Sequence, residues 1–181
     1  GWEAVTYTFV YEEFSSRGAS FVGEHDATFS ILNAGAKAQL PIADDVTRRG
    51  YTLSGWLYNN KAVDSYRVIA PSSGTPYIEF YSGGSENAVE TVPFNTIVNQ
   101  QLYLTAVWEA QPYTITYGGL TADKFVDGEA ATLNDAEDRY TITDSLTFAI
   151  PQKKGYTFND WLLVELDGKR VTEELDSINR E

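Results

Sequence analysis

Apolar and polar residues alternate with a period of two along several segments of the 181-residue chain. In residues 7–11 three aromatic side chains share one face of an extended segment, and Thr8 and Val10 share the other. Residues 113–117 repeat the pattern with two tyrosines and an isoleucine on one face. Such alternation is typical of a half-buried strand, so we expect a strand in each segment.

The segment 102–108 also alternates, but both of its faces are apolar, which predicts a strand in the centre of a sheet. Residues 77–81 and 140–150 are rich in aromatic and β-branched residues and are further strand candidates. The Asp-Gly pair at 167–168 is a hairpin-turn signal. Helix signals are thin, with Thr172 placed to cap one short turn. We therefore expect a mainly β fold.

The chain repeats itself at an offset of about 106 residues. Tyr-Thr-Phe-Val-Tyr at 7–11 recurs as Tyr-Thr-Ile-Thr-Tyr at 113–117. Arg-Gly-Tyr-Thr-Leu-Ser-Gly-Trp-Leu at 49–57 recurs as Lys-Gly-Tyr-Thr-Phe-Asn-Asp-Trp-Leu at 154–162. Several matches in the same order at a nearly constant spacing indicate tandem copies of one structural unit.

All four tryptophans occupy two equivalent positions of the repeat, Trp2 with Trp108 and Trp56 with Trp161. A repeat keeps the residues that its packing needs, so we predict that the four indoles are structural contacts. Replacement of Trp56 or Trp108 by alanine is then expected to unfold the first copy, with a loss of about 3–5 kcal/mol.

These matches divide the chain into two copies of a small sheet module. Residues 5–110 form the first copy, and residues 111–181 form a second copy that lacks a counterpart of the closing strand at 102–108. Residues 1–4 are interpreted as the end of a preceding copy or as a cloning remnant. The section 59–95 contains three prolines and glycine-rich turns, which predicts an elaborated loop with strands of its own.

Composition narrows the possible functions. The chain has no cysteine, which excludes disulfides, a thiolate nucleophile and cysteine-based metal sites. Lys and Arg total 13 against 26 Asp and Glu, so the formal net charge is −13. We expect neither nucleic acid nor an anionic membrane surface as a partner, because both are negatively charged. No apolar run reaches the roughly 18–20 residues of a membrane span.

The repeated motifs resemble the Listeria–Bacteroides repeat, the B-repeat of internalin-type bacterial surface proteins. The usual motif of that family is Gly-Tyr-Thr-Phe-x-Gly-Trp, and each unit ends with the motif Thr-Ala-x-Trp. The first copy has the Gly-Tyr-Thr motif at 50–56, with Leu53 as the single departure, and the Thr-Ala-x-Trp motif within 102–108. The second copy has the Gly-Tyr-Thr motif at 155–161, with Asp160 in place of glycine. The long middle section of the first copy departs from the pattern.

The resemblance implies a small β-grasp-like module of the α+β type, strung in tandem in extracellular bacterial proteins. Such modules look like stalks or adhesion elements, and no catalytic residue, cofactor or metal comes with them. The implied location is extracellular, at the bacterial cell surface. The implied partners are neighbouring repeats of the same chain and a host-surface protein or glycan.

Catalytic or metal sites would have to be built from His25 and the acidic clusters. The second copy has Ala130 at the position of the histidine, which favours a surface or loop histidine. Asp44 with Asp45, and the acidic cluster at 135–138, lack the spacing of a calcium loop. We interpret them as solvated faces rather than as a calcium site or a pair of catalytic carboxylates.

Four tyrosines lie outside the repeated motif and are the candidate ligand contacts: Tyr58, Tyr66, Tyr77 and Tyr81. Exposed rings could stack on sugars, and elaborated loops on a rigid scaffold often carry function. Packing of these rings in a core is the alternative, and the one that we favour.

The sequence therefore predicts a non-enzymatic extracellular repeat module that acts as a stalk, a spacer or an adhesion element. The alternative is a carbohydrate-binding module of a secreted glycoside hydrolase, which predicts exposed coplanar rings in residues 58–81. An enzyme would need converging carboxylates about 5–10 Å apart in a pocket. We expect no catalytic residue, no metal and no cofactor.

Overall fold

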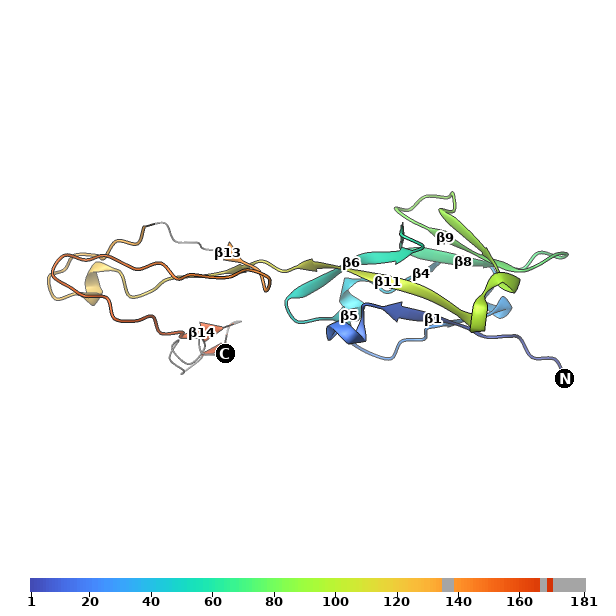
Figure 1. Ribbon diagram of the computed structural model, residues 1–181, viewed down its shortest axis with the longest axis horizontal. Coiled ribbons are helices and arrows are strands. Elements are labelled where there is room, and N and C mark those ends of the chain that lie inside the picture. The colour runs from blue at the N-terminus through green and yellow to red at the C-terminus, as the bar shows by residue number, and fades with distance from the viewer. Residues whose placement is uncertain (135–138, 167–168, 171–181) are drawn as a thin grey trace. The chain divides into compact units, whose positions relative to one another are not determined.

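The computed structural model of the chain describes residues 1–134, 139–166 and 169–170 (Figure 1). It divides into two compact units, Gly1–Gln111 and Pro112–Glu181. The regular elements of the described residues are strands and short 3₁₀-helices, so the predicted mainly β class is confirmed. No helix in this part of the chain has the length and hydrophobicity to cross a bilayer.

The first unit contains a five-stranded sheet with the order β3-β1-β11-β6-β7. Its strands are β1 (Tyr7–Glu12), β3 (Thr28–Phe29), β6 (Tyr51–Tyr58), β7 (Lys61–Val63) and β11 (Gln101–Ala110). As predicted, β11 is central: it pairs in parallel with β1 and antiparallel with β6. The first and the last strand of this sheet in chain order are therefore direct neighbours.

A second, antiparallel sheet of four strands has the order β10-β9-β8-β4. Its strands are β4 (Ala38–Gln39), β8 (Ser65–Ile69), β9 (Tyr77–Tyr81) and β10 (Glu90–Pro93). The strand predicted at 77–81 is confirmed as β9. The section 59–95 has strands of its own, as expected, but it supplies three of the four strands of a sheet and is not a loop.

Side chains of both sheets form one hydrophobic core. In Figure 1, β8 and β9 are drawn above β11. Phe80 of β9 and Leu104 of β11 are both 0% exposed. The ring of Phe9 on β1 lies 5.0 Å from that of Tyr66 on β8 and 6.2 Å from that of Phe80. Aromatic pairs at this spacing stabilise a core beyond the area that they bury.

The central position of β11 has a different cause from the one that its sequence indicated. Leu102, Leu104 and Ala106 are buried, whereas Tyr103 and Val107 on the other face are exposed. Only one of the two apolar faces is therefore covered. The strand is central because its backbone pairs with a neighbour along both edges.

The remaining elements of the first unit are short. Strands β2 (Ser20–Phe21) and β5 (Val46–Thr47) form a two-stranded ladder. The connections contain the 3₁₀-helices η1 (Ser15–Arg17), η2 (Ile31–Asn33), η3 (Ala43–Asp45), η4 (Phe94–Thr96) and η5 (Val98–Gln100). Asn59 and Asn60 have positive φ, which suits the two-residue hairpin between β6 and β7.

The described residues of the second unit form two short antiparallel ladders and one 3₁₀-helix. These are β12 (Tyr113–Thr114) with β13 (Arg139–Tyr140), β14 (Glu165–Leu166) with β15 (Lys169–Arg170), and η6 (Ala122–Lys124). The predicted turn at 167–168 lies between β14 and β15 but outside the described residues. The predicted helical turn at Thr172 also lies outside them.

The strands predicted at 113–117 and 140–150 are much shorter than expected. The segment 113–117 keeps its alternation, with Tyr113, Ile115 and Tyr117 half-buried and the threonines exposed. In the first unit β1 pairs with β3 on one side and with β11 on the other. No described residue of the second unit pairs with the segment as β11 does with β1, so strand pairing ends after two residues.

The four tryptophans lie in different environments. Trp56 is 2% exposed, and its Nε1 donates to the carbonyl oxygen of Pro41 at 2.8 Å. Trp108 and Trp161 are half-buried. The prediction of a structural contact is wrong for Trp2, which is fully exposed, because residues 1–6 form no regular element that would hold it against a sheet.

Candidate functional site

The four candidate tyrosines belong to strands of the first unit. Tyr58 and Tyr81 are buried, and Tyr66 and Tyr77 are half-buried. Tyr58 stacks on Phe80 with ring centroids 4.6 Å apart. With two of the four rings covered by protein, these tyrosines do not form an exposed platform on which a sugar could stack.

The hydroxyl of Tyr81 is held in a polar setting at the edge of the core. It donates a hydrogen bond to the carboxylate of Glu79, and the Lys37 ammonium lies 4.2 Å from the ring centroid. Burial, reinforced by the hydrogen bond to Glu79, raises the pKa of Tyr81 to about 12. Tyr81 is therefore a neutral donor at physiological pH.

His25 lies in the exposed loop between β2 and β3. Its Nε2 atom is hydrogen-bonded to the Tyr11 hydroxyl at 2.7 Å, and its ring stacks on Phe21 with centroids 4.2 Å apart. Burial against these rings lowers the pKa of His25, and the carboxylates of Asp45 and Asp26 oppose the shift. His25 is thus a loop histidine, as the sequence indicated.

Acidification is expected to lower the stability of the first unit through His25. A histidine with a lowered folded-state pKa binds more protons when unfolded, so its stabilising contribution is present above about pH 6.5 and is lost as the pH falls. The expected loss is below about 1 kcal/mol, because solvent screens this exposed ring. Thermal melting between about pH 5 and 8 checks it. His25→Gln should melt with a weaker pH dependence, and an unchanged dependence would contradict the prediction.

The acidic clusters form no metal site among the described residues. The carboxylate of Asp45 accepts a hydrogen bond from the backbone N–H of Ile42 at 2.9 Å, so it caps η3, in which Asp44 also lies. The cluster at 135–138 lies outside the described residues. Within the part that is described, no three His, Cys, Asp or Glu side chains gather where they could hold a metal ion.

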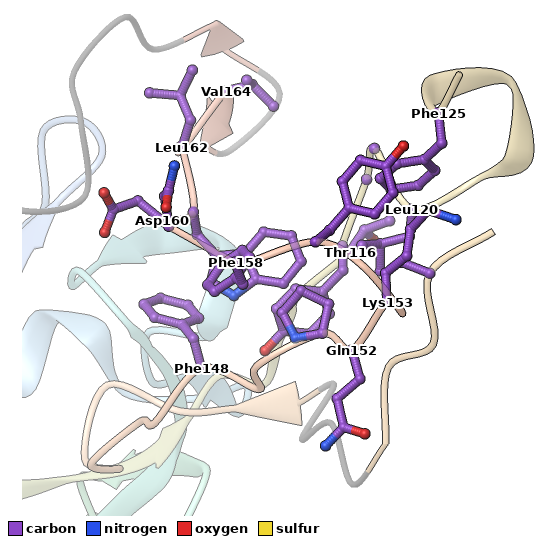
Figure 2. Close-up of a pocket in the computed structure, with 18 of the residues that line it drawn as sticks. Thr116, Leu120, Phe125, Phe148, Gln152, Lys153, Phe158, Asp160, Leu162 and Val164 are labelled. Atoms are coloured by element: carbon purple, nitrogen blue, oxygen red, sulfur yellow. The ribbon is translucent and has the colours of Figure 1, made fainter. Parts of the chain in front are cut away.

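A pocket of about 490 Å³ lies in the second unit (Figure 2). Most of its lining comes from the segments 115–120, 151–153 and 156–164, and most of these side chains are apolar or aromatic. In Figure 2, Phe158 lies among the labelled side chains with Phe148 nearby, and the Gln152 side chain points away from them. The pocket is therefore largely apolar.

The Tyr–Trp pair that lines this pocket repeats a contact of the first unit. The rings of Tyr117 and Trp161 are 4.8 Å apart with an interplanar angle of 49°. Those of Tyr11 and Trp56 are also 4.8 Å apart, at 48°. Both indole N–H groups donate to a backbone carbonyl oxygen at 2.8 Å. The equivalent pair thus has the same geometry in both units.

The turn before each Gly-Tyr-Thr segment is also shared. Its glycine has a φ of 76° in the first unit and 80° in the second, a left-handed conformation that favours glycine. A cationic side chain of the turn lies over the tyrosine ring in both units. The cation lies 3.9 Å from the ring centroid for Arg48 and Tyr51, and 5.0 Å for Lys153 and Tyr156. Each turn thus adopts the same local structure.

The ammonium group in the pocket lining is engaged within the unit. The Nζ atom of Lys153 lies 2.9 Å from a carboxylate oxygen of Asp127 and donates to the carbonyl oxygen of Glu129 at 2.8 Å. The hydrogen bond from Lys153 holds the pKa of Asp127 below its usual value. Lys153 therefore acts as an internal partner of the turn.

The lining is suited to holding apolar groups. Asp160 is the one carboxylate among the described residues that line the pocket, whereas hydrolysis by two carboxylates needs a second one about 5–10 Å away. Apolar and aromatic walls with a few polar groups are typical of binding pockets. Trp161, expected to be a structural contact, is both a partner of Tyr117 and part of this wall.

The candidate contacts predicted from the sequence all lie in the first unit, so this pocket was not predicted. The signal for it was the apolar residues of the segments 115–117 and 156–162, which line the pocket. The described residues of the second unit hold no counterpart of β11 beside these segments. Among the described residues of the second unit whose burial is given, none is fully buried.

Comparison with known protein families agrees with the family that the repeated motifs resemble. A family model described as the Listeria-Bacteroides repeat domain matches residues 7–82. The match runs from β1 through β9 and so includes much of the section 59–95. No curated protein and no solved structure matches the chain. Residues 7–82 thus match the Listeria–Bacteroides repeat family, as the motif at 50–56 predicted.

Proposed function

We propose that the chain is a non-enzymatic extracellular repeat module of a bacterial surface or secreted protein, acting as a stalk or spacer. The family match over residues 7–82 supports a repeat module. The residues shared by the two copies are tryptophan, tyrosine and glycine, and they make the same ring contacts and turns in both units. None of these residue types carries an imidazole or a carboxylate, the groups that most often act as general base.

The observation that carries this proposal is the pairing of β1 with β11, the first and the last strand of the first sheet in chain order. β1 and β11 are parallel neighbours, with Thr8–Glu12 paired to Gln101–Thr105. Tension along the chain pulls the start of β1 and the end of β11 in opposite directions along the strands. All the hydrogen bonds of this ladder are then loaded together in shear. This geometry suits a module that transmits force between neighbouring repeats.

The first unit is expected to resist force more strongly along this direction than across an edge hairpin. The chain has no cysteine, so introduced pairs give unique handles for single-molecule pulling. Handles at Val5 and Gln111 load the β1–β11 ladder in shear. Handles at Thr75 and Asn95 instead peel β10 from β9 one residue pair at a time. The first pair should rupture at the higher force.

Each handle pair is a control for the other, because both pairs are introduced in the same protein and attached through the same cysteine chemistry. An equal or lower rupture force for Val5 with Gln111 would contradict the load-bearing role. A variant with Leu104→Ala, inside β11, should lower the force in the shear direction. The exposed neighbour Tyr103→Ala is its matched control.

The charge of the chain supports an extended array. With a formal net charge of −13, neighbouring modules repel one another, which favours solubility and separation. The same charge is the reason why we propose partners other than nucleic acid. Neighbouring repeats of the same chain are the first partners of such a module.

An adhesive role would require contact with a host-surface protein or a glycan. A glycan array probed with the full chain tests the second case directly. Specific binding that is lost on replacement of the half-buried Tyr66 and Tyr77 by alanine would favour a carbohydrate-binding module over a spacer. Absence of glycan binding together with a strong shear response would favour the spacer.

A further inference from the structure

A groove of about 520 Å³ lies in the first unit and is lined by residues 21–25, 39–42 and 44–45. One wall leads out of β2, and the other runs from the end of β4 into η3. We call this feature the acidic groove. Both walls belong to connections at the ends of strands, where binding sites on a rigid scaffold are often found.

Hydrogen bonds within the unit fix both walls of the acidic groove. The backbone N–H of Val22 donates to the carbonyl oxygen of Asp45 at 2.9 Å, which ties one wall to the other. The carbonyl oxygen of Pro41 accepts from the buried indole of Trp56 at 2.8 Å. The groove is therefore formed before a partner binds, which lowers the entropic cost of binding.

Each wall exposes an aliphatic side chain. Val22 on one wall is 68% exposed, and Ile42 on the other is 54% exposed. The lining also includes the buried side chain of Leu40 and the half-buried ring of Phe21. An exposed apolar site that polar residues surround is typical of a protein interaction surface.

The charged side chains of the groove are carboxylates. Glu24, Asp44 and Asp45 line it, and no lysine or arginine is among the described residues that do so. Within the described part of the chain, none of these three carboxylates forms an ion pair. Burial lowers the pKa of His25, which stacks on Phe21, so its ring is neutral at physiological pH. The groove therefore carries a net negative charge.

We propose that the acidic groove binds a basic polypeptide segment in which an apolar side chain is flanked by lysine or arginine. The apolar side chain packs against Val22 and Ile42, and the flanking cations lie near Glu24 and Asp44. Burial of the apolar side chain supplies affinity, and the complementary charge supplies specificity and a high association rate. The formal net charge of −13 attracts the same class of partner over longer distances.

This binding surface goes beyond the spacer role and does not depend on it. The load-bearing ladder of the spacer proposal is β1 with β11, and neither strand lines the acidic groove. The pulling experiment and a binding experiment therefore test different parts of the first unit, so failure of either proposal is recognised separately.

The test uses the full chain and the synthetic peptide Lys-Leu-Lys-Leu-Lys, blocked at both ends. Calorimetry at low ionic strength should detect saturable binding that weakens as salt is added, because salt screens exposed charges. In ¹H–¹⁵N spectra the backbone N–H groups of 22–25 and 42–45 should shift. The indole N–H of Trp161, which lies in the second unit, should stay unchanged.

Two further peptides separate the apolar contribution from the charge and leave the chain unaltered. Lys-Ser-Lys-Ser-Lys keeps the three cations but has no apolar side chain to bury, so it should bind at least about fivefold more weakly. Glu-Leu-Glu-Leu-Glu keeps the apolar side chains but reverses the charge, so it should not bind.

A matched pair of double variants locates the charge that matters. Glu24→Gln with Asp44→Asn removes two carboxylates from the groove and should weaken binding of Lys-Leu-Lys-Leu-Lys at least about fivefold. Glu12→Gln with Glu109→Gln removes two carboxylates from exposed positions on β1 and β11. The second variant has the same net charge as the first and should change the affinity less than about twofold.

Several results would overturn the proposal. One is the absence of saturable binding by Lys-Leu-Lys-Leu-Lys. Equal binding of the serine peptide, or an equal loss in the two double variants, would mean that the total charge of the chain attracts the peptide and the groove does not. Shifts confined to residues outside the groove would place the binding site elsewhere.

Discussion

Replacement of Trp56 by alanine is expected to unfold the first unit, with a loss of about 3–5 kcal/mol in the free energy of unfolding. The indole is 2% exposed and packs against Tyr11 and Phe14, at centroid distances of 4.8 and 6.0 Å. Truncation leaves a cavity and also leaves the buried Pro41 carbonyl without its donor. A domain of this size has a total stability of about 5–15 kcal/mol, so the loss is a large part of it.

Urea denaturation followed by circular dichroism measures this loss. Trp56→Phe keeps an aromatic ring but loses the hydrogen bond, so it should cost less than the alanine variant. Trp108→Ala should also cost less, about 1–3 kcal/mol, because this indole is half-buried. The structure thus lowers the loss predicted from the sequence for that position. Unchanged melting of Trp56→Ala would remove this residue from the core.

Replacement of Phe80 by alanine is expected to cost about 3–5 kcal/mol as well. Phe80 is 0% exposed and stacks on Tyr58 with centroids 4.6 Å apart. It lies on β9 in the second sheet, yet it packs against residues of the first sheet. Its removal should therefore unfold both sheets in one transition rather than loosening the section 59–95 alone.

The readout is the indole N–H signal of Trp56, which lies in the first sheet, in ¹H–¹⁵N spectra along a urea titration. If 59–95 were an appended loop, Phe80→Ala would leave the midpoint of this transition unchanged. Thr91→Ala, at an exposed position on the adjacent β10, is the matched control and should change stability by less than about 0.5 kcal/mol.

The alternation of apolar and polar residues predicted a strand correctly where that strand has pairing partners on both sides. The alternation in 7–11 and 102–108 predicted β1 and β11, because side chains of a strand alternate between its faces whatever its neighbours are. The same alternation in 113–117 gave only the two-residue β12. A strand is completed by hydrogen bonds to a neighbour, and the described residues of the second unit hold no counterpart of β11 beside this segment.

For the candidate site, too, the local pattern predicted one part and the tertiary contacts decided the rest. The sequence drew attention to Tyr58 and Tyr81 as possible contacts, but burial depends on which sheet lies opposite, and both rings are covered. The pocket at Trp161 was missed because a pocket depends on which other segments pack between two given segments, and a local sequence pattern does not show this. Its neighbours Tyr117 and Lys153 follow the repeat closely, so the internal comparison of the two units locates it.

The sequence by itself determined the repeat, the family that residues 7–82 match, the mainly β class and the central strand of the first sheet, because spacing and period are local properties of the chain. Only the tertiary structure decided that the section 59–95 packs into the same core as the first sheet, that Trp2 is exposed, and that a pocket opens beside Trp161. These features depend on which segments, far apart in the sequence, pack against one another. The burial of a side chain depends on those contacts and not on its own segment alone.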